Sequence, residues 1–244
     1  MTAEEALERL LRLGFADDDA RTLVEHFADA EQRGRKSHGF ARVDWLETLP
    51  DLDPAARPEL VESGPGFERW DGRGALGYLT LAAICKRLAI ERPAPSRVVV
   101  AARCFPSGVL GYWVRRLAEA GLVGLLTATS PARLPQPGGG PPLVGTNPLA
   151  IAVPSRNGPP IVSDVSMGKV TYGDVISGAA REEDLVPFGG EQAHKAFALA
   201  LGLQLLVEAA AGQGYGAFLV ALDPTFGPTD FRERHPGLRL PGDR

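Results

Sequence analysis

The sequence contains little cysteine and lysine, and these shortages exclude several classes of protein. Two cysteines, Cys85 and Cys104, in 244 residues are too few for the disulfide framework of a small secreted domain. Lysine occurs at four positions, no basic run is present, and the net charge is −4. Nucleic-acid binding is therefore not expected. We expect reduced thiols and a cytoplasmic location.

Long hydrophobic runs and metal-binding patterns are also lacking. No apolar run approaches the roughly 18 residues of a membrane span, and the acidic start "MTAEEALERL" does not resemble a signal peptide. We therefore expect no membrane partner. Zinc-type Cys/His spacing, a P-loop, a nucleophile elbow and paired carboxylates are absent, so we predict no metal site and no serine hydrolase. The 44% hydrophobic content is enough for a substantial core.

The N-terminal part reads as two helices. Thr2 and Glu5 stand in capping-box positions ahead of the first helix. Residues 17–34 predict a second helix with an acidic N-cap and with Gly34 at its end. The triplet Ser-His-Gly then follows on a connection whose position these helices determine.

Two histidines in this region have different interpretations. His26 lies within the second predicted helix, and we interpret it as a side chain at the boundary of the core. His38, with Arg42 four residues later, is either a capping pair in a turn or a proton donor beside an anion-binding arginine. Position alone favours the turn.

The rest of the chain alternates helical and strand-like patterns, which predicts an α/β core. Helices are expected at 81–91, 108–121 and 194–212, and strands at 97–102, 122–130, 149–154, 160–165 and 216–224. We expect residues 1–70 to form a helical N-terminal segment carrying the Ser-His-Gly triplet, and residues 71–244 to form the core of the same structural unit. The tail from residue 227 is rich in proline, glycine and arginine and is expected to be irregular.

Two glycine-rich stretches resemble phosphate loops. Residues 72–77, "GRGALG", satisfy GxGxxG, which binds a dinucleotide only between a buried parallel strand and a helix. The preceding "GFERWD" does not read as such a strand, so we predict a turn. The stretch "QPGGGPP" at 136–142 has too many prolines to offer consecutive amide donors, and we predict a flexible loop.

Five blocks in order make the chain resemble the malate/L-lactate dehydrogenase family. Of these, "GTNP" before a strand and "DVSM…YG" are the most specific. The blocks are "AEQRGRKSHGFAR" (30–42), "GYWVRRLAEAGLVGLLTATS" (111–130), "LVGTNPLAIAVP" (143–154), "SDVSMGKVTYGDV" (163–175) and "LVPFGGEQAHKAFALAL" (185–201). The family also includes diketogulonate reductase, ureidoglycolate dehydrogenase, sulfolactate dehydrogenase and the pyrroline/piperideine-2-carboxylate reductases.

The resemblance implies a fold and an activity. It implies a non-Rossmann α/β fold with a helical N-terminal part packed on a mixed-sheet core. It also implies hydride transfer between NADH or NADPH and a small molecule, a 2-oxo acid or cyclic imine. The family further implies a homodimer with the active site near the subunit interface.

The resemblance assigns the catalytic residues within the Ser-His-Gly region. His38 matches the histidine that delivers a proton to the carbonyl oxygen, Arg42 matches the neighbouring arginine, and Ser37 completes the site. The chemistry agrees, because hydride addition builds charge on oxygen and a histidine with a pKa of about 6.5 is a suitable acid. A guanidinium binds a carboxylate through two parallel hydrogen bonds.

Several further residues are assigned by the resemblance to the cofactor. Asn147 also reads as a residue that bonds its own loop, and Lys195 and His194 also read as surface residues. The assigned residues are Asn147, Asp164, Val165, Ser166, Met167, His194, Lys195, Gly242 and Asp243.

The chain departs from the family at several positions. Pro106 stands where the family has a second active-site histidine, and Leu46 stands where it has a tyrosine. Segments are missing between 178 and 185 and between 223 and 240, so the C-terminal part is shortened. We hypothesise that Arg103 supplies a new anion contact.

These features lead to two functional hypotheses. The first is an NAD(P)H-dependent reductase that acts on a C=O or C=N bond of a 2-oxo acid, a cyclic imine or a natural-product intermediate, free or attached to a carrier. The second keeps the fold without redox chemistry, as a lyase, isomerase or cyclase using His38 as acid/base, or as a non-catalytic binding protein.

Overall fold

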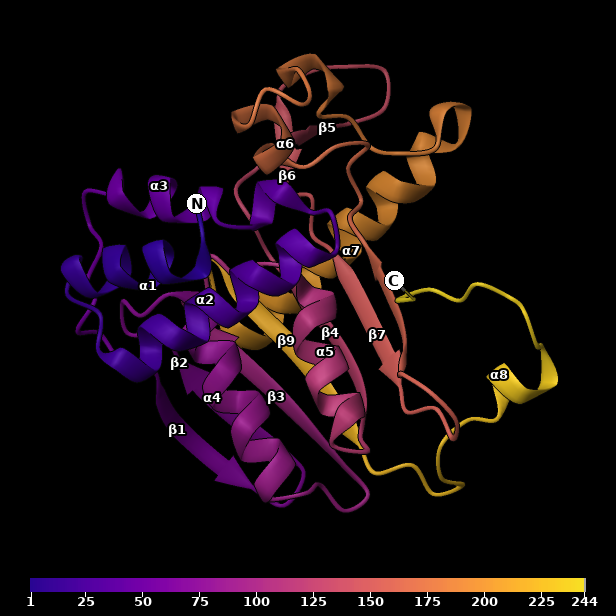
Figure 1. Cartoon of the computed structure of the whole chain (residues 1–244). Coiled ribbons are helices and arrows are strands. Elements are labelled where there is room, and N and C mark those ends of the chain that lie inside the picture. Colours follow the sequence, from indigo (N-terminus) through magenta and orange to yellow (C-terminus); the bar gives the residue numbers. More distant parts are fainter. Residues whose placement is uncertain (244) are drawn as a thin grey trace.

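The computed structural model describes residues 1–243, and its centre is a seven-stranded sheet in the order β1-β2-β3-β9-β4-β7-β8 (Figure 1). The pair β2/β3 is parallel and the other neighbouring pairs are antiparallel, which confirms the predicted mixed sheet. The sheet contains β1 (Glu59–Gly64), β2 (Phe67–Asp71), β3 (Ser96–Ala102), β4 (Val123–Ala128), β7 (Leu149–Val153), β8 (Ile161–Val165) and β9 (Gly216–Leu222), while β5 (Leu134–Pro135) and β6 (Pro142–Val144) form a separate pair.

Five of the α-helices in residues 1–243 lie close to their predicted positions, and the three shortest were not predicted. The α-helices are α1 (Ala3–Arg12), α2 (Asp17–Gln32), α3 (Ala41–Glu47), α4 (Gly77–Ile90), α5 (Leu110–Glu119), α6 (Tyr172–Ile176), α7 (Ala193–Ala211) and α8 (Phe231–Arg234), and the 3-10 turns are η1 (Lys36–His38), η2 (Glu182–Asp184) and η3 (Gly190–Gln192). Apart from α8, residues 228–243 of the tail form no regular element, as expected.

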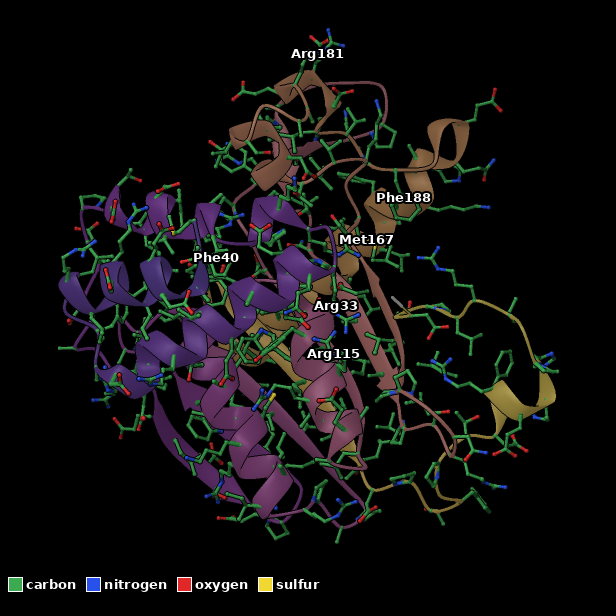
Figure 2. The ribbon with its side chains drawn as sticks, viewed as in Figure 1. Arg33, Phe40, Arg115, Met167, Arg181 and Phe188 are labelled. Carbon is green, nitrogen blue, oxygen red and sulfur yellow. The ribbon has the colours of Figure 1, made fainter. Side chains whose placement is uncertain are left out.

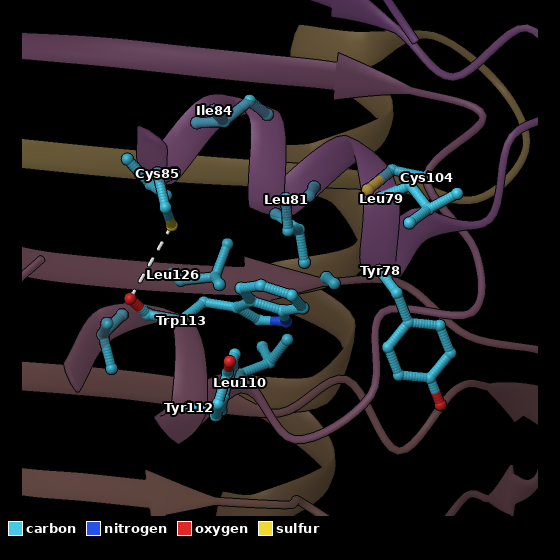
Figure 3. Packing of buried hydrophobic residues seen from close by; sticks show 14 of the residues in the cluster. Tyr78, Leu79, Leu81, Ile84, Cys85, Cys104, Leu110, Tyr112, Trp113 and Leu126 are labelled. Atoms are coloured by element: carbon cyan, nitrogen blue, oxygen red, sulfur yellow. Dashed lines mark hydrogen bonds between the residues drawn. The ribbon is translucent and has the colours of Figure 1, made fainter. Parts of the chain in front are cut away.

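The main core lies between the sheet and the helices α4 and α5 (Figure 1). Trp113 of α5, Leu126 of β4 and Ile84 of α4 are fully buried there (Figure 3). The Cys85 thiol donates to the Trp113 carbonyl over 3.7 Å, and both cysteines are free and buried. The N-terminal helices pack outside this layer, with α2 against α4.

Helix α7 covers the opposite face of the sheet, against β9, β3 and β4. Its inner face buries Ala196, Ala200 and Val207. Contrary to the expectation from the sequence, the segment Gly190–Ala211 is long and apolar enough to cross a membrane by length and composition alone. Because one face packs on the sheet, α7 is a layer of the α/β fold with an exposed apolar outer face.

The start of each N-terminal helix tests a capping prediction. The capping box of Thr2 and Glu5 is present as predicted. The acidic N-cap predicted for α2 is wrong: Ala16 is the N-cap, and Asp17, Asp18 and Asp19 occupy the first turn. There they stabilise the helix through its dipole instead of through a capping hydrogen bond.

The stretch before the GxGxxG sequence is a parallel strand with two buried residues, Glu68 and Trp70, so its interpretation as non-strand was wrong. Strand β2 pairs in parallel with β3 and buries Glu68 completely. Its carboxylate accepts from Arg87 at 2.9 Å, from Arg97 at 2.8 Å and from the Trp70 indole at 3.1 Å. The sheet thus begins within the first 70 residues, and the division at residue 70 stays a prediction.

The GxGxxG loop itself joins this parallel strand to α4, and two of its glycines pack closely against the chain that follows β3. A Cβ on Gly77 would lie 2.7 Å from the Pro106 carbonyl oxygen, and one on Gly72 would clash with the Arg103 carbonyl oxygen. The chain after β3 therefore covers the amide end of α4. The glycines serve this close backbone packing.

Candidate active site

A cavity of about 410 Å³ lies at one end of the strands of the sheet, under the N-terminal helices. Strands β3, β4 and β8 finish at this end, whereas β7 and β9 begin there. The lining segments include 105–110 after β3 and 128–131 after β4, while η1, α3 and the start of α6 supply the other side. The topology thus brings distant parts of the sequence to one site.

The end of α2, next to the turn that carries His38, is held by a partly buried cluster of charges. Asp29 near the end of α2 pairs with Arg33 over 3.1 Å and with Arg115 of α5 over 2.6 Å, so α2 is tied to α5 (Figure 2). Glu31 then accepts from the Phe40 amide at 3.1 Å. The first set of contacts fixes the end of α2 against α5, and the second joins α2 to the chain that follows η1, so the position of His38 is determined from both sides.

His38 lines the cavity, and its Nδ1 is enclosed and makes no hydrogen bond within the described chain. Burial lowers the pKa of its imidazole to about 4, the nearby Arg42 lowers it further, and Asp174 opposes the shift. As long as no anion is bound beside His38, its imidazole is therefore neutral at pH 7. An anion bound beside it would raise its pKa.

Arg42 also lines the cavity, and its Nε is buried without a hydrogen-bond partner in the described residues. Its guanidinium lies 5.3 Å from the ring centroid of Trp45. A Cβ on Gly173 would come within 2.8 Å of Arg42 Nη2, so the glycine leaves space for this side chain. A guanidinium held with an unused donor is suited to bind an anionic ligand.

The predicted Ser37 stands behind His38 and does not line the cavity. It contacts α6, where Thr171 and Asp174 form a capping box. Hydrogen bonds from Thr171 and Ser37 keep the pKa of Asp174 below its usual value despite burial. Asp174 is thus a fixed negative charge near His38, which sequence reasoning missed.

His26 is fully buried, so its interpretation as a boundary residue was wrong. Its Nε2 accepts from the Val109 amide at 3.1 Å, and its ring lies 4.9 Å from that of Tyr78 and 5.3 Å from that of Trp113. Burial lowers its pKa to about 3. It supports the cavity wall from behind as a neutral imidazole.

This buried imidazole makes stability depend on pH. The pKa of His26 is about 3 in the folded chain against 6.5 for the free side chain. The unfolded chain therefore binds the proton first, and stability that is complete above pH 6.5 declines as the pH falls. We expect the free energy of unfolding of the wild type to drop, relative to His26→Gln, by about 1.4 kcal/mol per pH unit below that value.

Urea unfolding at pH 7, 6 and 5 measures this slope. His235→Gln is the matched control, because His235 is exposed in the tail. Equal slopes for wild type and His26→Gln would contradict the buried neutral state of His26.

The "DVSM" residues divide between the cavity and the core. Asp164 and Ser166 line the cavity, whereas Val165 and Met167 do not. Asp164 and Val165 belong to β8, where successive side chains point to opposite faces. Asp164 accepts from the Gly111 amide at 2.9 Å, and burial raises the pKa of its carboxyl. Met167 is buried in a second hydrophobic cluster beside α7 (Figure 2).

Asn147 makes hydrogen bonds within the protein, although not to its own loop as the second of its two interpretations had it. It is fully buried. Its Nδ2 donates to the Ala200 carbonyl at 2.9 Å and to Gln204 at 3.2 Å, while its Oδ1 accepts from the Ser130 amide at 3.3 Å. These bonds join α7 to the loops at the end of the strands where the cavity lies.

The other predicted cofactor residues lie outside the cavity. His194 and Lys195 are exposed in the first turn of α7. The Gly242 carbonyl accepts from Arg33 at 3.1 Å, and Asp243 forms an ion pair with Arg232. The Pro241 carbonyl accepts from the Val162 amide, so the C-terminal segment runs along the outer edge of β8.

Sequence reasoning chose the wrong additional arginine. Arg103 pairs with Asp71, is exposed and does not line the cavity, so the hypothesis of an anion contact there was wrong. Arg35, Tyr78 and Arg133 line the cavity instead. No signal in the sequence marked them, because they come from three separate segments.

Comparison with known proteins identifies the family. Residues 2–185 match the malate/L-lactate dehydrogenase family. The Δ1-pyrroline-2-carboxylate/Δ1-piperideine-2-carboxylate reductase of Pseudomonas syringae pv. tomato is 29% identical over 290 aligned positions, covering 95% of this chain and 83% of that protein. Because the alignment has more positions than this chain has residues, the chain lacks segments that the relative has.

Two further relatives agree. The (2R)-3-sulfolactate dehydrogenase (NADP(+)) of Chromohalobacter salexigens is 32% identical over 177 residues, 70% of this chain and 52% of that protein. The crystal structure of the Δ1-piperideine-2-carboxylate reductase of P. syringae pv. tomato covers 99% of this chain and 89% of its own, with a TM-score of 0.82 and 26% identity.

The fold and the family match define the chain as an oxidoreductase. It belongs to the malate/L-lactate dehydrogenase family, as a shortened member.

Proposed function

We propose that the chain is an NAD(P)H-dependent reductase. It transfers hydride to a C=O or C=N bond of a 2-oxo acid, a cyclic imine or a related biosynthetic intermediate. The observation that carries the proposal is the pairing of His38 and Arg42 in one cavity, each with a buried nitrogen that has no hydrogen-bond partner in the described chain. Such groups call for a ligand, because unpaired buried polar atoms cost free energy.

The two side chains have complementary roles. Arg42 binds the carboxylate next to the reacting carbon and so orients the substrate. The bound carboxylate adds negative charge beside His38 and raises the pKa of its imidazole above the value of about 4 in the empty site. His38 can then donate a proton to the carbonyl oxygen or imine nitrogen as hydride adds to carbon. The imidazole is left neutral, and solvent reprotonates it.

The residues of the cavity fit a nicotinamide cofactor. The volume of the cavity lies within the roughly 300–1,000 Å³ of small-molecule sites. When bound, NADH or NADPH supplies the hydride. Hydroxyl groups that line the cavity suit the carboxamide and ribose, and we assign this role to Ser130, Thr146 and Ser166. The relative named for NADP(+) supports a dinucleotide.

We also propose a homodimer, and the outer face of α7 supports it. Leu199, Leu205 and Leu206 are 51%, 54% and 41% exposed on this face, beside the exposed Gly202. So continuous an apolar surface is typical of an interface, and a second copy offers the matching face.

A titration with NADH and NADPH tests the proposed function. We expect a saturable change in nicotinamide fluorescence with at least one nucleotide. At a hundred times its Kd, that nucleotide should stabilise the fold by about 2.7 kcal/mol in thermal unfolding. The nucleotide that responds identifies the cofactor.

Two comparisons complete the titration. AMP is the control ligand, because it lacks the nicotinamide. If neither dinucleotide produced a response, the reductase proposal would be wrong, and His38 would be tested as the acid/base of a redox-silent lyase, isomerase or cyclase.

A further inference from the structure

Tyr78, at the start of α4, is a cavity residue that has no role in the proposed reaction so far. Its side chain is 1% exposed and lines the cavity. The hydroxyl points away from the core side chains of α4 and α5 (Figure 3) and makes no hydrogen bond within residues 1–243. Unlike the Nδ1 of His38, which is enclosed, the phenol oxygen is open to the cavity. A ligand in the cavity can therefore reach it.

The aromatic ring of Tyr78 is held by three contacts. It packs edge-on against His26, with ring centroids 4.9 Å apart, and against Phe27, with centroids 5.5 Å apart. The third contact is Gly108, where a Cβ would come within 2.3 Å of Tyr78 Cε1. Because the hydroxyl lies on the long axis of the ring, these contacts also fix the phenol oxygen. The buried imidazole of His26 thus helps to position a cavity residue.

Tyr78 lies between Pro106 and Arg42. The preceding residue, Gly77, packs so closely on the chain after β3 that a Cβ would lie 2.7 Å from the Pro106 carbonyl oxygen. Pro106 lines the cavity with neither an N–H group nor a polar side chain, so a donor here must come from a neighbour. The Arg42 guanidinium is close enough to lower the pKa of the phenol, against the larger rise that burial causes. The phenol therefore remains a donor at pH 7.

The hydroxyl of Tyr78 differs from the hydroxyls that we assign to the cofactor. Those of Ser130 and Thr146 lie 3.5 Å apart and share a hydrogen bond. The hydroxyl of Ser166 accepts from the Gly168 amide at 3.2 Å. Each of these three groups thus has a partner in the protein, whereas the phenol is left for a ligand beside Arg42.

We propose that Tyr78 is a second catalytic residue, whose hydroxyl donates a hydrogen bond to the carbonyl oxygen of the substrate. This inference rests on the proposed function and deepens it. Arg42 holds the carboxylate, while His38 and Tyr78 reach the neighbouring oxygen from the two sides of the cavity. A carbonyl oxygen has two lone pairs and accepts from both groups. An imine nitrogen has one lone pair, which the proton from His38 occupies, so the arrangement favours a 2-oxo acid.

The hydrogen bond from Tyr78 matters most as charge develops. When hydride adds to the carbonyl carbon, the electron pair of the C=O bond moves to oxygen. Tyr78 stabilises that charge, and His38 transfers the proton that forms the new hydroxyl group. The phenol keeps its own proton, since burial raises its pKa. A donor already in place needs no reorganisation at the moment of reaction.

Tyr78→Phe tests the assignment, because it removes the hydroxyl and keeps the ring. Single-turnover reduction of pyruvate and of phenylpyruvate measures the rate. Titration calorimetry compares pyruvate with propionate and phenylpyruvate with 3-phenylpropionate, and only the first acid of each pair has the carbonyl oxygen. Tyr112→Phe is the matched control, because Tyr112 also packs against His26, at 4.8 Å, but does not line the cavity. NADH and NADPH affinities are measured by fluorescence in parallel.

We expect the wild type to reduce at least one 2-oxo acid and to bind it more tightly than its partner. Tyr78→Phe should lower the rate by about 100-fold, the loss typical of one donor to a developing oxyanion. It should lower the binding preference by only about 3- to 10-fold, the value of a neutral hydrogen bond. Nucleotide affinity and melting temperature should not change. Tyr112→Phe should keep the wild-type rate and preference.

Several results would overturn the inference. One is the absence of a preference within either pair in the wild type, and another is an unchanged rate in Tyr78→Phe. Equal weakening of all four acids would place the hydroxyl on the carboxylate, and a lower melting temperature would give it a structural role. If neither nucleotide binds the wild type, the proposed function fails, while the paired acids still report on Tyr78 without nucleotide.

Discussion

Replacing His38 with alanine is expected to reduce the rate of reduction by about 100- to 10,000-fold, the usual contribution of a positioned general acid. Nucleotide affinity should not change, because the imidazole acts on the substrate. The measurement is single-turnover oxidation of the bound nucleotide, with nucleotide titrations on the same preparations. His235→Ala is the control, since that histidine lies in the exposed tail. Undiminished turnover in His38→Ala would remove His38 from the mechanism.

The pH dependence of kcat/KM should also report the protonation of His38. Reduction requires the imidazolium form of His38, whose pKa is about 4 in the empty site. The value of kcat/KM for reduction should therefore fall as the pH rises above about 4. The pKa seen in kcat should be higher, because a bound carboxylate stabilises the charged imidazole. In the oxidative direction the neutral imidazole accepts the proton, so kcat/KM should rise through the same pKa and then become constant.

Replacing Arg42 with glutamine is expected to lower kcat/KM by about 100-fold, equivalent to about 2.8 kcal/mol. The physical reason is the loss of two charge-assisted hydrogen bonds to the substrate carboxylate. Arg42→Lys should recover only part of the loss, because an ammonium keeps the charge without the planar fork. Steady-state kinetics across substrate concentration measure the effect on KM and on kcat.

Arg42→Gln should also change a second measurable quantity, the pKa of His38. The Arg42 guanidinium lowers the pKa of this imidazole, so Arg42→Gln should raise it. NMR titration of the histidine signals in the unliganded protein detects that shift. Arg103→Gln is the control, because Arg103 pairs with Asp71 outside the cavity. An equal loss of kcat/KM in Arg103→Gln would contradict the assignment of Arg42 as the anchor.

Local patterns in the sequence predicted most of the fold. The Thr2–Glu5 capping box, the β-branched strand at 97–102 and the apolar helix ending at Gly212 each depend on neighbours along the chain. Strand β2 was missed because one of its two buried positions is occupied by a glutamate. Glu68 is tolerated there only because Arg87 and Arg97 pair with it from other elements.

The candidate site could be predicted only in part, for a similar reason. The family blocks pointed to His38 and Arg42, and the structure places both in the cavity. Their electrostatics depend on Asp174, which is 136 residues further along the chain than His38. Arg103 and Arg133 look alike in sequence, each just beyond a strand. The backbone directs one to Asp71 and the other to Tyr172, and no spacing rule distinguishes them.

The C-terminal segment along β8 protects the sheet from association with other chains. As the outermost strand, β8 would offer unpaired amide and carbonyl groups for intermolecular strand pairing. The Pro241 carbonyl occupies the Val162 amide, and the ion pair of Asp243 with Arg232 holds the segment in place. The segment that carries Pro241 and Asp243 therefore covers part of an edge strand that would otherwise promote aggregation.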